Sequence, residues 1–299
     1  MKTLIQKPLV TALLIAGMGV VSNGAIAAPL FSVNEGFTGG TKADATITDV
    51  DRMSGSYNEA TTITAFDPGT GAGTFQTSLY FDVGTLHSPL GASYDLADSS
   101  DRGGITYDLY ALYQGGGTFV TTDFGLATES TEFTFLAGAG TIDELRFYAD
   151  MNNDSNVNPL NNGTAGVGGS EPSTGGAFYS VNNTVDDVLL ALGATTSGNG
   201  NQTCTGDNNC GSYGVTSTFN LVDNAVGYDG SDFFVDPIPF YNIQVSTGQF
   251  NGVGIAVDAT TYLLGSQDSE FVAVPEPTSI ALLGFGLIGL GLRHRKQAK

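Results

Sequence analysis

Short stretches of alternating apolar and polar residues recur along the middle of the chain. In residues 74–83, for example, Phe75, Thr77, Leu79 and Phe81 fall on one side of the alternation. A period of two, β-branched and aromatic residues, and breaks rich in Gly, Asp, Asn and Pro are typical of β-strands. The pattern predicts strands at 61–66, 74–83, 105–113, 119–120, 131–136, 145–149, 178–181, 185–192, 212–221, 241–245, 249–257 and 271–274.

Strands at this spacing favour an all-β fold, and we expect a β-sandwich or jelly-roll-like body. The strand at 105–113 is expected to end at the glycines 115–117. Residues 185–192 also fit a short helix capped by Thr184, although we favour a strand there. Two stretches rich in Asn, Gly, Ser and Thr, residues 152–176 and 194–209, are predicted to be exposed loops.

The N-terminus has the three parts of a secretory signal peptide. Lys2 and Lys7 precede an apolar run at 9–21. After this run comes a small-x-small triplet whose two small residues are Ala25 and Ala27. The apolar run is about 13 residues long, whereas a membrane-spanning helix needs about 18 or more. We therefore predict export by the Sec machinery and cleavage after Ala27.

The C-terminus carries a proline motif, an uncharged apolar segment at 280–292 and a basic cluster, in that order. Proline cannot continue a helix from upstream, so the motif sets the start of an apolar helix about 24 Å long. The basic cluster should stay in the cytoplasm, which places the body outside. The residues of this predicted signal are Pro275, Glu276, Pro277, Arg293, Arg295 and Lys296.

This arrangement resembles the PEP-CTERM sorting signal of Gram-negative bacteria. The resemblance implies a transient inner-membrane anchor, cleavage by an exosortase near the Pro-Glu-Pro motif, and transfer to the cell surface or extracellular matrix. The chain then divides into a signal peptide at 1–27, an extracellular all-β domain at 28–273, and the sorting signal at 274–299. A plain membrane anchor is the alternative for the last segment.

Charge excludes one class of partner. The full chain has 10 basic and 30 acidic residues, and cleavage after Ala27 and after Glu276 would leave four basic and all 30 acidic residues, for a formal charge near −26. Nucleic acid is excluded as a partner, because binding phosphates requires basic groups. Cations are the natural counter-species of such a body, although the charge also suits a protein that must stay soluble.

The two cysteines, Cys204 and Cys210, enclose a five-residue loop. In an oxidising compartment they are predicted to form a disulfide. A zinc site is not expected, because two thiols without a neighbouring His do not supply four ligands.

Oxygen-bearing side chains alternate after residue 149, which is the pattern of a calcium-binding loop. The sequence resembles the first half of an EF-hand-type loop, but Ser155 stands where its glycine belongs and Asn161 where its bidentate Glu belongs. An ordinary Asx-rich turn is the alternative. No other cofactor is expected, and the predicted calcium ligands are Asp150, Asn152, Asp154 and Asn156.

No catalytic residues are predicted, and we expect the protein not to be an enzyme. Outside the terminal signals the only histidine is His87, and no G-x-S-x-G motif is present. The couplet Asp186-Asp187 cannot form a facing acid and base, because adjacent strand residues point to opposite faces.

Segments at 185–190, 211–219 and 233–241 are similar to the flocculation-associated PEP-CTERM proteins. The resemblance implies a non-enzymatic matrix protein that promotes flocculation or biofilm cohesion within exopolysaccharide or cell-surface glycans. We expect exposed Phe and Tyr residues on strands to contact neutral sugars, and the acidic surface to be bridged to polyanionic polysaccharide through divalent cations. A secreted carbohydrate-binding module and a polysaccharide-active hydrolase are the alternatives.

Overall fold

The computed structural model describes residues 30–38, 46–96, 107–126, 129–140, 142–151, 153, 155, 174–203, 211–224, 227–236, 242–247 and 255–272. The described part of the protein is nearly all β, as predicted, with 66% of its residues in strands and 3% in helices. The elements are β1 (Phe31–Asn34), η1 (Glu35–Thr38), β2 (Thr46–Val50), β3 (Arg52–Asp67), β4 (Ala72–His87), β5 (Ser93–Asp95), β6 (Asp108–Thr122), β7 (Ser130–Phe135), β8 (Glu144–Asp150), β9 (Val188–Gly193), β10 (Thr195–Thr203), β11 (Gly211–Ser217), β12 (Asn220–Leu221), α2 (Gly230–Phe233), β13 (Phe234–Asp236), β14 (Asn242–Thr247) and β15 (Thr260–Val272).

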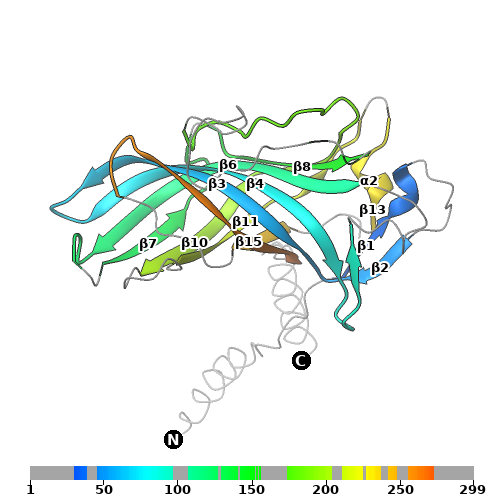
Figure 1. The fold of residues 1–299 in the computed structure, drawn as a ribbon, viewed down its shortest axis with the longest axis horizontal. Coiled ribbons are helices and arrows are strands. Elements are labelled where there is room, and N and C mark those ends of the chain that lie inside the picture. The colour runs from blue at the N-terminus through cyan, green and yellow to red at the C-terminus, as the bar shows by residue number, and fades with distance from the viewer. Residues whose placement is uncertain are drawn as a thin grey trace, which may run out of the picture.

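Eight antiparallel strands close into a barrel rather than the expected sandwich. Around the barrel the order is β6, β7, β10, β11, β14, β15, β3 and β4, and the pairing of β4 with β6 closes the ring. Closure is possible because β3 and β4 are each 16 residues long and β6 has 15, so β4 stays paired with both neighbours. The long strands extend along the molecule in Figure 1.

Strand β6 changes its partner at three consecutive glycines. Its first half pairs with β8 as far as Gln114, and its second half pairs with β7 from Gly117 onward. We predicted that the strand would end at these glycines, but it continues through them. A Cβ on Gly116 would lie 2.5 Å from the carbonyl oxygen of Phe75, and one on Gly117 would lie 1.9 Å from that of Thr134. The glycines therefore allow three strands to approach closely where β7 and β8 diverge.

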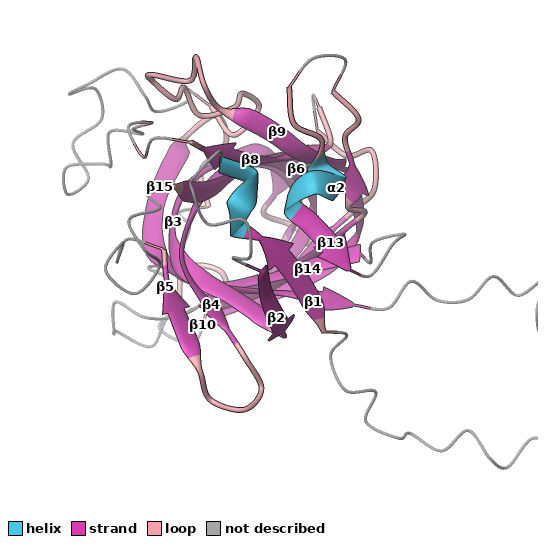
Figure 2. Cartoon of the chain, turned by 90° about the vertical axis from the view of Figure 1, so that its right-hand side faces the viewer, coloured by secondary structure: helices cyan, strands magenta, loops and turns pink. Residues whose placement is uncertain are grey.

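A second, three-stranded sheet and α2 lie at one end of the barrel (Figures 1 and 2). The sheet has the order β13-β1-β2 and packs its aromatic side chains onto the end of the barrel core. Phe31 of β1 meets Phe271 of β15 edge to face, with ring centroids 4.7 Å apart, and Phe234 of β13 packs on the same ring at 6.0 Å. Such aromatic pairs stabilise a core beyond the area that they bury.

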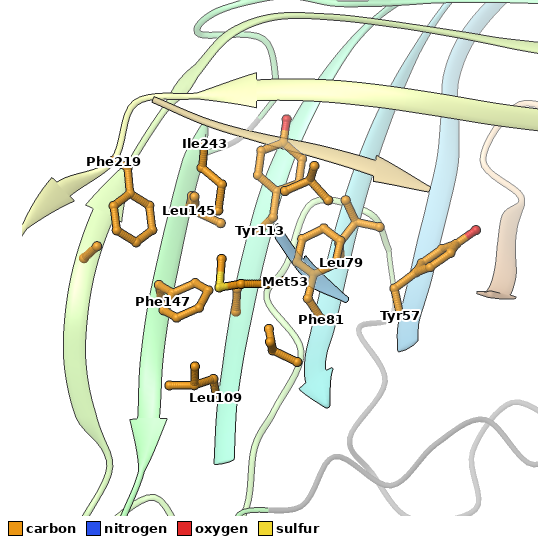
Figure 3. Close-up of a cluster of buried hydrophobic side chains, with 14 of the residues drawn as sticks. Met53, Tyr57, Leu79, Phe81, Leu109, Tyr113, Leu145, Phe147, Phe219 and Ile243 are labelled. Carbon is orange, nitrogen blue, oxygen red and sulfur yellow. The ribbon is translucent and has the colours of Figure 1, made fainter. Parts of the chain in front are cut away.

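The interior of the barrel is filled by apolar and aromatic side chains from alternate positions of every barrel strand except β10. Figure 3 shows part of this core, in which Leu79 and Phe81 of β4 lie near Tyr57 of β3 and Tyr113 of β6. The alternation that predicted β4 therefore marks inward residues correctly.

Strand β10 was predicted to be an exposed loop, and this prediction is wrong. Its inward positions are Gly198, Gly200 and Gln202, so the strand shows no apolar alternation. The space is filled by neighbouring strands instead, because a Cβ on Gly200 would lie 2.5 Å from the Cβ of Tyr213. Aromatic residues on the adjacent strands replace the missing apolar side chains of β10.

Of the remaining strand predictions, some are confirmed and others are wrong. The segment 185–192 is a strand, although it begins only at Val188, and 178–181 forms no strand. Most of β15 was missed, because polar residues interrupt its alternation, and residues 248–254 lie outside the described part of the chain. Two separate strands expected at 105–113 and 119–120 are the single strand β6.

Residues 174–187, which we call the covering segment, lie across the outer face of β3, β4 and β6. Ser78 of β4 donates a hydrogen bond to the carbonyl oxygen of Gly175 at 2.9 Å, and the amide of Gly175 donates to Thr62 Oγ1 at 3.0 Å. Beneath the segment, Tyr80, Tyr110 and other outward side chains form a second buried cluster with Tyr179. This face of the barrel is therefore buried on both sides.

Candidate functional sites

Four aspartates converge at one end of the covered face, and we call them the aspartate cluster: Asp82, Asp108, Asp150 and Asp187. Asp108 of β6 is in register with Asp150 of β8, and Asp82 of β4 is in register with Tyr110. Asp187 comes from the covering segment, where it accepts hydrogen bonds from Tyr110 at 2.5 Å and from Ser155 Oγ at 2.9 Å. Three strands and the covering segment thus bring their acidic groups together.

The cluster holds a proton near neutral pH. Burial and the neighbouring Asp82 raise the pKa of Asp108 to about 7, and burial also raises the pKa of Asp82. The two carboxyl groups hydrogen-bond to each other, which requires a proton on one of them. Burial, together with all four aspartates, also raises the pKa of Tyr80, so its hydroxyl stays protonated.

Sequence reasoning missed most of this cluster. Asp187 was considered only as half of an adjacent pair, and its partners come from strands far away in the chain. The available signal was the position of Asp82 between the apolar residues Phe81 and Val83, where an acidic residue must find a partner or remain protonated.

The predicted calcium site can be located only through Asp150, which is 1% exposed and accepts a hydrogen bond from the amide of Ser155 at 2.6 Å. Its predicted companions Asn152, Asp154 and Asn156 lie outside the described residues. Within the described part of the chain, no group of three or more His, Cys, Asp or Glu residues has a geometry that could hold a metal ion. Calcium binding remains a prediction.

A second acidic group lies inside the barrel. Glu59 of β3 is 3% exposed and accepts hydrogen bonds from Thr61, from Thr77 at 2.7 Å and from the Tyr213 hydroxyl at 3.0 Å. Burial raises the pKa of Glu59, although these three donors oppose the shift. Because Tyr213 belongs to β11, this contact joins two parts of the barrel that are not adjacent in the sheet.

His87 forms a contact with a serine. Its Nε2 lies 2.6 Å from Ser54 Oγ, and burial lowers the pKa of His87, so the ring is neutral near pH 7. A catalytic dyad also needs a group that orients the other ring nitrogen. Among the described residues, no carboxylate forms a hydrogen bond to that nitrogen. The pair fits a cross-strand contact between β3 and β4.

The other predicted site residues lie outside the described part of the chain. They include Cys204 and Cys210, although the paired strands β10 and β11 end at Thr203 and begin at Gly211, directly beside them. The disulfide therefore remains a prediction. None of the helices in the described ranges is long and apolar enough to cross a membrane. The undescribed site residues are Ala25, Ala27, Cys204, Cys210, Pro275, Glu276, Pro277, Arg293, Arg295 and Lys296.

The C-terminal segment is similar to a known sorting signal. A family model of the PEP-CTERM protein-sorting motif matches residues 273–296. The chain is a PEP-CTERM sorting domain-containing protein. The motif identifies an exported protein that is directed to the cell surface and processed by an exosortase, as predicted. Comparisons of this PEP-CTERM protein with curated proteins and with solved structures found no match.

Proposed function

We propose that the barrel of this PEP-CTERM protein is a non-enzymatic structural component of the extracellular matrix that promotes flocculation or biofilm cohesion. The observation that carries the proposal is the position of the sorting motif. The last strand, β15, ends at Val272, and the motif begins at residue 273. Cleavage near Pro275 would therefore leave every barrel strand intact.

The construction of the barrel supports a structural role. Its interior is packed with aromatic side chains, and the pairing of β4 with β6 leaves no open edge in the eight-stranded ring. A closed ring avoids edge-to-edge aggregation of strands, which suits a protein that must persist outside the cell. The similarity of residues 185–190 and 233–241 to flocculation-associated proteins supports the choice of cohesion.

The first test is the intact mass of the protein recovered separately from culture medium, floc matrix and membranes. The proposal expects a species in the matrix or medium that lacks residues 1–27 and everything after the Pro-Glu-Pro region. A membrane-bound species that still carries Arg293 to Lys299 would contradict release and favour a permanent anchor.

The second test is the sedimentation rate of flocs formed by cells that lack the gene, with and without complementation. Loss of settling that complementation restores would support the cohesion role, and unchanged settling would reject it. Adding a chelator to wild-type flocs tests cation bridging, which predicts dispersal. Turnover of purified matrix polysaccharide by the released protein would instead favour a hydrolase.

A further inference from the structure

The outer surface of β7, β10, β11 and β14, which we call the open face, differs chemically from the rest of the barrel. Its side chains point outward between the inward core residues, and all are exposed or half-buried. Of these described positions only Glu132 is charged. The open face consists of Ser130, Glu132, Thr134, Ser197, Asn199, Asn201, Thr203, Ser212, Gly214, Thr216, Asn242, Gln244 and Ser246.

The register aligns these groups in rows across the strands. Ser197 of β10 pairs with Thr216 of β11, which in turn pairs with Gln244 of β14. Neighbouring strands are about 4.8 Å apart, so each row offers hydroxyl and amide groups at short, regular intervals. Hydroxyls and amides both donate and accept hydrogen bonds, as sugar hydroxyl groups do.

Charge decides between possible partners of this face. The chain has no Lys or Arg between Phe147 and Leu292, and its net charge is −20, so a polyanion would be repelled. An apolar partner does not fit either. The exposed apolar side chains Phe124 and Leu126 belong to the turn between β6 and β7, outside the open face. An uncharged polymer rich in hydroxyl groups is the partner that is complementary to this surface.

We propose that the open face binds an uncharged polysaccharide chain of the extracellular matrix, a proposal that rests on the matrix role given above. This site is built from hydroxyl and amide groups rather than from the aromatic side chains expected from the sequence. Among the aromatic side chains whose exposure the structure describes, only Phe124 and Tyr228 are exposed, and both lie outside the strands. Asn199 and Asn201, both exposed on β10, lie near the middle of the open face.

The test compares two double variants of the full chain, exported and processed by its own cells. Asn199→Asp with Asn201→Asp places two negative charges on the open face and removes two amide donors. The matched control, Asn182→Asp with Asn220→Asp, makes the same chemical change at exposed positions outside it. Retention is measured on the neutral and acidic fractions of polysaccharide from the cells' own matrix, each immobilised separately.

We expect wild type and control to be retained on the neutral fraction and the open-face variant to bind about tenfold more weakly. Equal binding of both variants, or retention on the acidic fraction alone, would overturn the proposal. Floc settling separates this result from the matrix role. If settling is lost without the gene but is unchanged in the variant with Asn199→Asp and Asn201→Asp, the matrix role is retained and the open face is rejected as its binding surface. If cells that lack the gene settle as fast as wild type, the matrix role is rejected, and binding of the open face is then judged by the retention measurement.

Discussion

The outer surface of the barrel has two faces that share one scaffold but carry different side chains. On the covered face, outward positions of β3, β4 and β6 hold residues such as Ala60, Tyr80 and Leu112, which are buried beneath the covering segment. On the open face, the corresponding positions of β7, β10, β11 and β14 hold mainly threonine, serine, asparagine and glutamine, and they contact solvent.

This difference shows that inward and outward positions carry different information. Inward residues of both faces are mostly apolar or aromatic because they share one core, apart from glycines that make room for rings and buried polar residues such as Glu59, Thr77 and Gln202. Outward residues depend on what lies above them. On the covered face, the covering segment is held by close packing and by hydrogen bonds such as that of Ser78 with Gly175. A surface that binds a hydrophilic polymer instead requires accessible polar groups, as on the open face.

The largest expected effect comes from breaking the contact that seats the covering segment. A Cβ on Gly175 would lie 2.1 Å from the carbonyl oxygen of Gln76 and 2.8 Å from that of Ala60. Gly175→Ala should therefore lower the free energy of unfolding by about 3 kcal/mol, measured by urea denaturation.

The matched change on the open face is Gly214→Ala. A Cβ there meets nothing nearer than Ser246 Oγ at 3.6 Å, so stability should stay within about 0.5 kcal/mol of wild type. Equal losses at Gly175 and Gly214 would mean that the two faces do not differ in packing.

A smaller effect is expected from the hydrogen bond that joins the two faces through the interior. Tyr213→Phe removes the donor to Glu59 Oε2 and leaves that oxygen buried without it. The free energy of unfolding should fall by about 2 kcal/mol. Tyr94→Phe, at a half-buried position on β5, is the control and should change it by less than about 0.5 kcal/mol. If both variants lost the same stability, the contact with Glu59 would have no special role.

Local patterns predicted some features and not others. The sorting motif is contiguous, and the family model confirms it at residues 273–296. The strand β4 was also found, because Phe75 and Leu79 alternate within one segment. Barrel closure was not predicted, because it depends on the pairing of β4 with β6. The glycines of β10 and the meeting of Asp82 with Asp108 likewise depend on residues from other strands, which a single sequence does not place.

The smallest effect concerns pH and the aspartate cluster. Burial, together with Asp82 and Asp150, raises the pKa of Asp108 from 3.8 to about 7, so the folded state binds this proton more tightly than the unfolded state. The resulting stabilisation is fully present below the unfolded pKa and is lost as pH rises from about 4 through 7. The other groups that face the cluster are Asp187 and Tyr80.

Asp108→Asn should make this loss of stability between about pH 4 and pH 7 shallower by on the order of 1 kcal/mol, because an amide does not titrate there. Urea denaturation at several pH values measures the slope. Glu132→Gln removes one carboxylate from the open face and serves as the matched control, with the slope of wild type expected because Glu132 is exposed. If both variants flattened the slope equally, net charge would explain the pH dependence. A smaller slope for Asp108→Asn alone would assign it to the covered face, where burial forces carboxyl groups to share a proton.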